Sequence, residues 1–140
     1  TTRAAEQAAY DVLLATVRTL VAIQAADVAP GQAYDSLDAA LEARDAVLVM
    51  LDEQAESVGD GTYTALVQLR ADLVRAVPGA ESDLPRLVSH TSGATVPSLV
   101  LAHQLYGDLA READLVARNR IHRPGFILGG IALEVLSASD

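Results

Sequence analysis

Three groups of chain-breaking residues divide the first 80 residues and limit what they can fold into. They are Pro30-Gly31, Gly59-Asp60-Gly61 and Pro78-Gly79. Proline cannot continue a helix and glycine turns freely, so each group ends the segment before it. Each group is preceded by a segment with the apolar period of a helix, and these segments cover residues 3–28, 34–58 and 62–77. Because helices with short connections pack as antiparallel bundles, we expect an antiparallel three-helix bundle over residues 1–80.

Apolar residues recur at three- and four-residue steps in all three segments, which is typical of one apolar helix face. In the first segment the stripe is Tyr10, Leu13, Leu14, Val17, Leu20, Val21 and Val28. In the second, a seven-residue pattern contains Tyr34, Leu37, Leu41, Leu48, Leu51, Ala55 and Val58. In the third, the face is Leu66, Leu69, Leu73, Val74 and Val77. We expect Asp60 or Thr62 to cap the third helix.

Arg44 occupies a position of the seven-residue pattern where leucine is the usual residue. We expect its aliphatic stem to pack and its guanidinium to pair with a nearby carboxylate. The alternative is that Arg44 reaches a partner.

The pattern changes after Ala80, where short segments alternate with turn residues. Residues 86–90 fit a strand, and residues 132–136 alternate apolar side chains as a closing strand that pairs with it. Between them, Pro97 opens a helix to Tyr106, and Asp108 is a plausible N-cap of a second helix. Asn119 is expected to end that helix in the left-handed conformation. The predicted fold is therefore mainly α, with a small β–α–α–β subdomain over residues 81–140 packed as a cap on the bundle.

Composition excludes several classes of protein. A net charge of −9 and a pI near 4.6 repel phosphate backbones and anionic lipid, so we do not expect direct nucleic-acid binding. The absence of cysteine excludes disulfides, thiolate metal sites and a cysteine nucleophile. We find no apolar run near the roughly 18 residues of a membrane span and expect none. The chain begins Thr1-Thr2 rather than Met, so we expect a part of a longer polypeptide.

The residues that usually carry chemistry are scattered. His90, His103 and His122 lie in different predicted elements, and their spacing indicates no metal site. Carboxylates such as Glu112 and Asp114 belong to helical charge patterns, and the glycines lack the lysine of a phosphate-binding loop. We therefore predict no enzyme activity, no catalytic residues, no metal and no cofactor.

The second part of the chain carries motifs in an order that resembles a known family. They are Leu84-Pro85-Arg86-Leu87, Pro97, Leu99 to Asp108, Arg118 to Ile121, Pro124-Gly125-Phe126, Gly129-Gly130 and Leu133 to Leu136. Their order resembles the C-terminal section of the phage Mu-type N proteins, the DNA circularisation (or circulation) proteins of contractile tails. His122-Arg123 reverses the order usual there, and Leu128 replaces a proline. Gly107-Asp108, Asn119-Arg120-Ile121 and Leu133-Glu134-Val135 also resemble LysM modules, which are β–α–α–β units.

The resemblance implies a structural tail or baseplate component of a phage or prophage, located in the virion or in the host cytoplasm during assembly. Its implied partners are other tail or baseplate proteins, or further copies of itself. The alternative is a LysM-like module that binds peptidoglycan glycan. The candidate interaction surface is Arg118, Arg120, Arg123, Phe126, Ile127 and Leu128. Two alternatives stay open, namely that the arginines only neutralise acidic helices of this chain and that the apolar trio folds back onto it.

Overall fold

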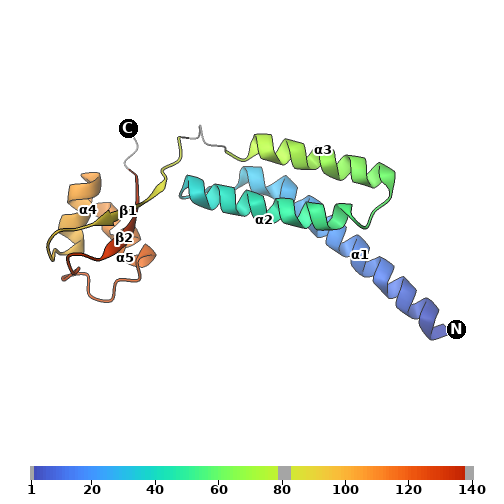
Figure 1. Cartoon of the computed structure of the whole chain (residues 1–140), viewed down its shortest axis with the longest axis horizontal. Helices are drawn as coiled ribbons and strands as arrows, with labels where there is room; N and C mark the ends of the chain where they lie inside the picture. Colours follow the sequence, from blue (N-terminus) through green and yellow to red (C-terminus); the bar gives the residue numbers. More distant parts are fainter. Residues whose placement is uncertain (1, 79–82, 138–140) are drawn as a thin grey trace. The chain divides into compact units, whose positions relative to one another are not determined.

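A computed structural model of the chain describes residues 2–78 and 83–137. The chain divides into two compact units, Thr1–Ser82 and Asp83–Asp140. The described residues are mainly helical, with five α-helices and one two-stranded sheet (Figure 1). The three longer helices belong to the first unit, and the sheet with the two shorter helices belongs to the second.

The first unit contains three helices in the order predicted. They are α1 (Thr2–Val28), α2 (Leu37–Ala55) and α3 (Asp60–Ala76), with a 3-10 turn, η1 (Ala29–Gly31), after α1. Ser36 begins α2 as its N-cap, and its hydroxyl accepts a hydrogen bond from the Ala39 N–H at 3.2 Å. The predicted cap of α3 was wrong: Gly59 is the N-cap residue, and the helix starts at Asp60 without a side-chain cap.

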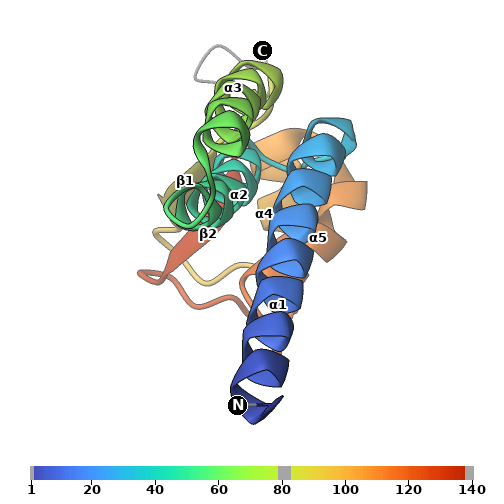
Figure 2. The same cartoon turned by 90° about the vertical axis from the view of Figure 1, so that its right-hand side faces the viewer.

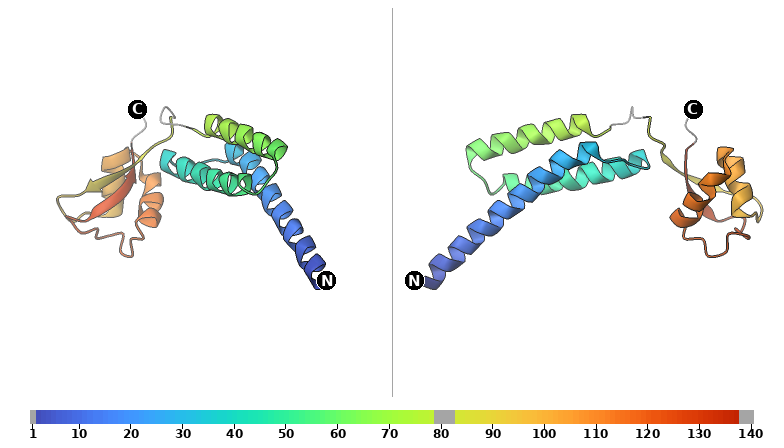
Figure 3. Two further views of the ribbon diagram at one scale, coloured as in Figure 1. Left: turned by 45° about the vertical axis from the view of Figure 1, so that its right-hand side comes forward. Right: turned by 180° about the vertical axis from the view of Figure 1, so that it is seen from behind.

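Helices α2 and α3 lie side by side, and each contributes buried leucines to the first unit (Figure 1, Figure 3). The fully buried ones are Leu37, Leu51, Leu66 and Leu73. At the surface of the pair, the Arg70 Nε donates to the Asp52 carboxylate at 3.0 Å. Arg44 is largely buried along its side chain and pairs with Asp45 at 2.8 Å. The expected pairing of Arg44 with a nearby carboxylate is therefore confirmed.

The apolar stripe predicted for the first helix does not face its neighbours, and this part of the prediction was wrong. Helix α1 contacts α2 and α3 through small side chains, with Ala22 and Ala26 buried. Most of the predicted stripe is exposed, namely Tyr10, Leu13, Val17, Leu20, Val21 and Val28. Alanines let helix backbones approach closely, so the alanine face is the one that packs. The 27-residue α1 is also longer than the 19-residue α2 and the 17-residue α3.

The N-terminal half of α1 extends beyond the ends of α2 and α3 (Figure 1, Figure 2). Within the described residues, Thr2–Gly31 is the one segment long and apolar enough to cross a membrane; an 18-residue window in it has a mean hydropathy of 1.6, and 17% of that window is buried. Core helices of soluble proteins and leader sequences share these properties. Helix α1 resembles a membrane span in length and composition alone. Two charged residues, Asp11 and Arg18, lie within it.

The second unit follows the predicted β–α–α–β order. Its elements are β1 (Leu87–Thr91), α4 (Ser98–Tyr106), a 3-10 turn η2 (Leu109–Arg111), α5 (Glu112–Arg118) and β2 (Ala132–Leu136). The strands pair antiparallel, with Ser89 opposite Glu134. Gly107 ends α4 with φ +66°, and the Asp108 carboxylate accepts a hydrogen bond from the Ala110 N–H at 2.9 Å. The cap predicted at Asp108 is present on η2, which leads directly into α5, whereas α5 itself follows Arg111 without a side-chain cap.

The core of the second unit lies between its two helices and β2. Its buried members are Leu101, Ala102, Leu115, Ile127, Leu133 and Val135. The alternation of β2 explains this, because Leu133 and Val135 face the helices while Glu134 is exposed. The Tyr106 hydroxyl reaches the end of the strand and accepts a hydrogen bond from the Leu136 N–H at 3.1 Å. The guanidinium of Arg111 lies 5.4 Å from the centre of the Tyr106 ring.

Candidate functional site: two loops joined on the second unit

Two loops of the second unit are held together by backbone hydrogen bonds, and we call them the paired loops: residues 92–97, before α4, and residues 119–131, between α5 and β2. Val96 and Ile127 exchange two backbone hydrogen bonds, at 3.0 and 2.9 Å. The Ser98 N–H donates to the Pro124 carbonyl at 2.7 Å, and the Gly130 N–H donates to the Ser92 carbonyl at 2.8 Å. The paired loops therefore form one ordered surface rather than two independent turns.

Two glycines permit this approach of the loops. A Cβ on Gly129 would lie 2.9 Å from the backbone carbon of Ala94, closer than real Cβ contacts allow. Gly130 has φ +80°, a conformation that side chains disfavour. The glycine pair noted in the sequence is thus required at one position by space and at the next by backbone conformation.

The six residues of the predicted interaction surface separate into two groups. Phe126 and Leu128 are 74% and 59% exposed, and Arg120 and Arg123 are exposed on the same loop. Ile127 is only 4% exposed and belongs to the core, because its backbone pairs with Val96 and its side chain points inward. The expectation that all three apolar residues are exposed was therefore wrong for Ile127.

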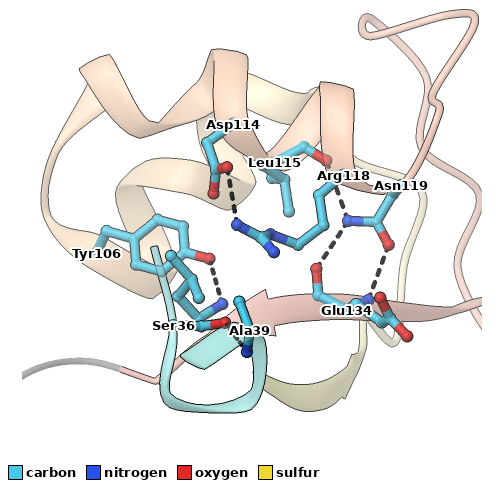
Figure 4. Close-up of polar contacts among 9 residues, drawn as sticks. Ser36, Ala39, Tyr106, Asp114, Leu115, Arg118, Asn119 and Glu134 are labelled. Carbon is cyan, nitrogen blue, oxygen red and sulfur yellow. Dashed lines mark hydrogen bonds and ion pairs between the residues drawn. The ribbon is translucent and has the colours of Figure 1, made fainter. Parts of the chain in front are cut away.

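Arg118, the sixth residue, lies away from the loop surface. Its guanidinium donates to the Asp114 carboxylate at 3.0 Å, one helical turn earlier on α5 (Figure 4). Its side chain is 18% exposed. This contact matches the alternative reading, in which an arginine neutralises an acidic residue of its own unit. The locally basic character of the surface thus rests on Arg120 and Arg123.

Asn119 positions the longer of the paired loops, in a way that the sequence did not reveal. It does not adopt the predicted left-handed conformation, since its φ is −91°; Arg120 adopts it instead, with φ +49°. The Asn119 amide nitrogen donates to the carbonyls of Leu115 at 3.0 Å and Glu134 at 2.8 Å, and its oxygen accepts from the Glu134 N–H at 2.8 Å (Figure 4). A single indication of this role was present in the sequence, namely that asparagine is common at helix ends.

The chemistry available on the paired loops is that of contact. Two exposed apolar side chains lie on a loop that also carries two guanidinium groups, each able to bind a carboxylate through two hydrogen bonds. Ile131, which was not among the predicted residues, adds a third apolar side chain that is 48% exposed. Among the described residues, no three His, Asp or Glu side chains lie close enough to hold a metal ion. His122, also on this loop, has its Nδ1 2.7 Å from the Arg120 carbonyl oxygen.

Comparison with known proteins adds no identification. No family model matches the chain, and no curated protein matches it. The resemblance to phage Mu-type N proteins and to LysM modules therefore stays a prediction from the sequence motifs. The geometry of the paired loops is the structural basis for a functional proposal.

Proposed function

We propose that this chain is a structural component of a phage or prophage tail or baseplate, and that its second unit binds another virion protein through the paired loops. In this proposal the first unit is an antiparallel three-helix bundle and the second is a LysM-like β–α–α–β module. The sequence resemblance supports the biological setting. The observation that carries the binding role is the exposure of Phe126 and Leu128 on a loop surface that carries two arginines.

The composition of this surface favours a protein partner. Aromatic and arginine side chains contribute most strongly to protein interfaces, and Phe126 is the most exposed large apolar residue among those described. Its neighbours Arg120 and Arg123 suit an acidic or carboxylate-bearing contact. The hydrogen bonds between the paired loops hold the surface in place before binding, which lowers the entropy cost of ordering it. The proposal assigns no reaction to the chain.

The test is complementation of tail assembly in the phage or prophage that encodes the chain. Phe126→Asp combined with Leu128→Asp removes both apolar contacts while leaving the buried Ile127 in place. We expect tail particles, counted by electron microscopy, to fall at least about tenfold, as loss of an interface hot spot predicts. The matched control is Leu109→Asp on η2, a 55% exposed leucine outside the paired loops. Normal assembly by the double variant would refute the proposal.

Glycan binding is the second candidate, favoured by the β–α–α–β order and by the Asn119 contact between α5 and β2. The paired loops hold one aromatic side chain, Phe126, on which a sugar ring could stack. Retention on purified peptidoglycan distinguishes the two functions. Saturable retention that Phe126→Ala abolishes and Leu109→Asp leaves unchanged would favour glycan binding, whereas no retention above that on a matrix without peptidoglycan would favour the protein partner.

A further inference from the structure

Helix α1 exposes a regular apolar stripe, which we define as Tyr10, Leu13, Val17 and Leu20 and call the α1 stripe. These four side chains are between 47% and 62% exposed. Their spacing of three, four and three residues is that of the a and d positions of a coiled coil. Single exposed leucines are ordinary on protein surfaces, but a patterned row over two heptads is typical of a helix that binds another helix.

Most of the α1 stripe lies on the side of α1 opposite to the contacts with α2 and α3, while Leu20, at its end, also borders an open hollow with Ser57 and Thr62. Leu13 and the buried Ala22 are nine residues apart, which is about two and a half helical turns. Val17 and the buried Ala26 have the same separation. Leu13 and Val17 therefore point away from the packed face of α1, and a second helix can reach them without displacing α2 or α3.

We propose that the α1 stripe pairs antiparallel with the α1 stripe of a second copy of this chain, forming a homodimer. In this register Tyr10 of one copy faces Leu20 of the other, and Leu13 faces Val17. An antiparallel pair places a positions against d positions, so each layer contains one of each. The stripe is complementary to itself, as a two-fold interface requires.

Charges beyond the ends of the stripe favour this direction. Continuing the same register, Arg3 of one copy faces Asp27 of the other, and Glu6 faces Gln24. Arg3 and Asp27 are exposed and make no ion pair within the part of the chain that the structure describes. A parallel pair would instead place Arg3 against Arg3 and Asp27 against Asp27. Opposite charges across the ends therefore select the antiparallel arrangement.

The size of the contact fits a reversible dimer. Covering the stripe and the flanking Val21 and Val28 on both copies buries on the order of 1,000 Å² in total, near the lower limit of specific interfaces. We expect a dissociation constant on the order of 10 µM, since small interfaces leave little surplus over the cost of association.

A lipid surface fits the stripe less well than a second copy. The net charge of the chain is −9, which disfavours approach to anionic lipid, and its cations include no lysine. A membrane span would bury Asp11 and Arg18 in hydrocarbon, which is costly. A dimer leaves both in water, because they lie towards the side of the helix away from the stripe.

Sedimentation equilibrium of the 140-residue chain, from about 0.5 µM to about 500 µM, tests the dimer at concentrations below and above its expected dissociation constant. We expect the mass to rise from 14.6 kDa towards twice that value. Val17→Glu should weaken association at least about tenfold, because a buried unpaired carboxylate is costly. The matched control is Val12→Glu on the same helix, where Val12 is exposed but off the stripe. A monomer at every concentration, or equal effects of the two variants, would overturn the proposal.

Cysteine cross-linking tests the direction, since the chain has no cysteine of its own. An antiparallel pair places Glu6 near Gln24 of the other copy, whereas the two Glu6 positions lie roughly 27 Å apart at 1.5 Å per residue. A mixture of Glu6→Cys and Gln24→Cys chains should therefore form mixed disulfides, and Glu6→Cys alone should not. Efficient cross-linking of Glu6→Cys alone would indicate a parallel pair and overturn the proposed register.

Flotation with neutral and with anionic phospholipid vesicles tests whether the α1 stripe binds a lipid surface instead of a second copy. We expect the wild-type chain to remain unbound to both kinds of vesicle. Binding that Val17→Glu abolishes, without self-association, would assign the stripe to lipid instead. The dimer does not depend on the proposed role of the paired loops, because Val17 and Phe126 belong to different units and their variants are read out separately.

Discussion

Asn119 and Glu134 are joined by two hydrogen bonds of 2.8 Å, in which the side-chain amide of Asn119 pairs with the backbone N–H and carbonyl of Glu134 (Figure 4). The amide thus pairs with the backbone of Glu134 in the way that the backbone of a neighbouring strand would. The same amide also donates to the Leu115 carbonyl near the end of α5. One side chain therefore fixes both ends of the loop that carries Phe126.

Asn119→Ala should destabilise the second unit by about 2 kcal/mol, since it removes three hydrogen bonds of roughly 0.5–1.5 kcal/mol each and the change is partly offset by water. Asn119→Asp should destabilise the unit at least as much as Asn119→Ala, because it keeps an acceptor for the Glu134 N–H but places a carboxylate oxygen against the Leu115 and Glu134 carbonyls. The measurement is urea unfolding followed by the NMR signals of β2. The control Gln104→Ala, at an exposed site on α4, should change little. Equal stability of Asn119→Ala and wild type would contradict the assigned role.

Gly129→Ala should cost about 1–3 kcal/mol, the usual range for forcing an extra carbon into a packed site. The reason is the 2.9 Å approach that its Cβ would make to the Ala94 backbone. Gly125→Ala is the matched control, because a Cβ there meets nothing within 4 Å. Chemical-shift changes should extend into residues 92–97 for Gly129→Ala and stay local for Gly125→Ala. Shifts confined to residues 125–131 in both variants would show that the loops are not coupled.

Ile127→Ala and Phe126→Ala should differ sharply although the residues are adjacent. Ile127 is buried in the core, so its truncation should cost about 2–4 kcal/mol. Phe126 is 74% exposed, so its truncation should change the free energy of unfolding by less than about 0.5 kcal/mol. Thermal unfolding of both variants provides the comparison. A large loss of stability in Phe126→Ala would mean that the ring packs against the unit and is not presented to a partner.

The elements of the second unit could be predicted because their boundaries are set locally. Gly107 and Asp108 each stop or cap a helix through their own backbone or side chain. The alternation of Leu133 and Val135 fixes which face of β2 is buried, and hence how it pairs with β1. The left-handed residue was misplaced by one position, because Asn119 uses its side chain to bind β2, a contact across 15 residues of sequence.

The packed face of α1 and the exposed part of the loop surface could not be predicted, because both depend on distant contacts. An apolar period marks a stripe but does not say which neighbour covers it, and in α1 the alanine face packs instead. Ile127 and Phe126 look alike in the sequence. Only the pairing of Ile127 with Val96, 31 residues earlier, turns one side chain inward and leaves the other exposed.

The alanine face of α1 makes a last prediction. Ala26→Leu should destabilise the first unit by about 1–3 kcal/mol, since Ala26 is 3% exposed and the larger side chain would separate α1 from its neighbours. The same substitution at Ala8, which is exposed in the N-terminal half of α1, should change stability by less than about 0.5 kcal/mol. Both changes involve the same pair of residue types, so differences in helix propensity cancel. Urea unfolding at low micromolar concentration, followed by far-ultraviolet circular dichroism, compares them below the expected dimer range. Equal stability of the two variants would show that α1 does not pack through its alanines.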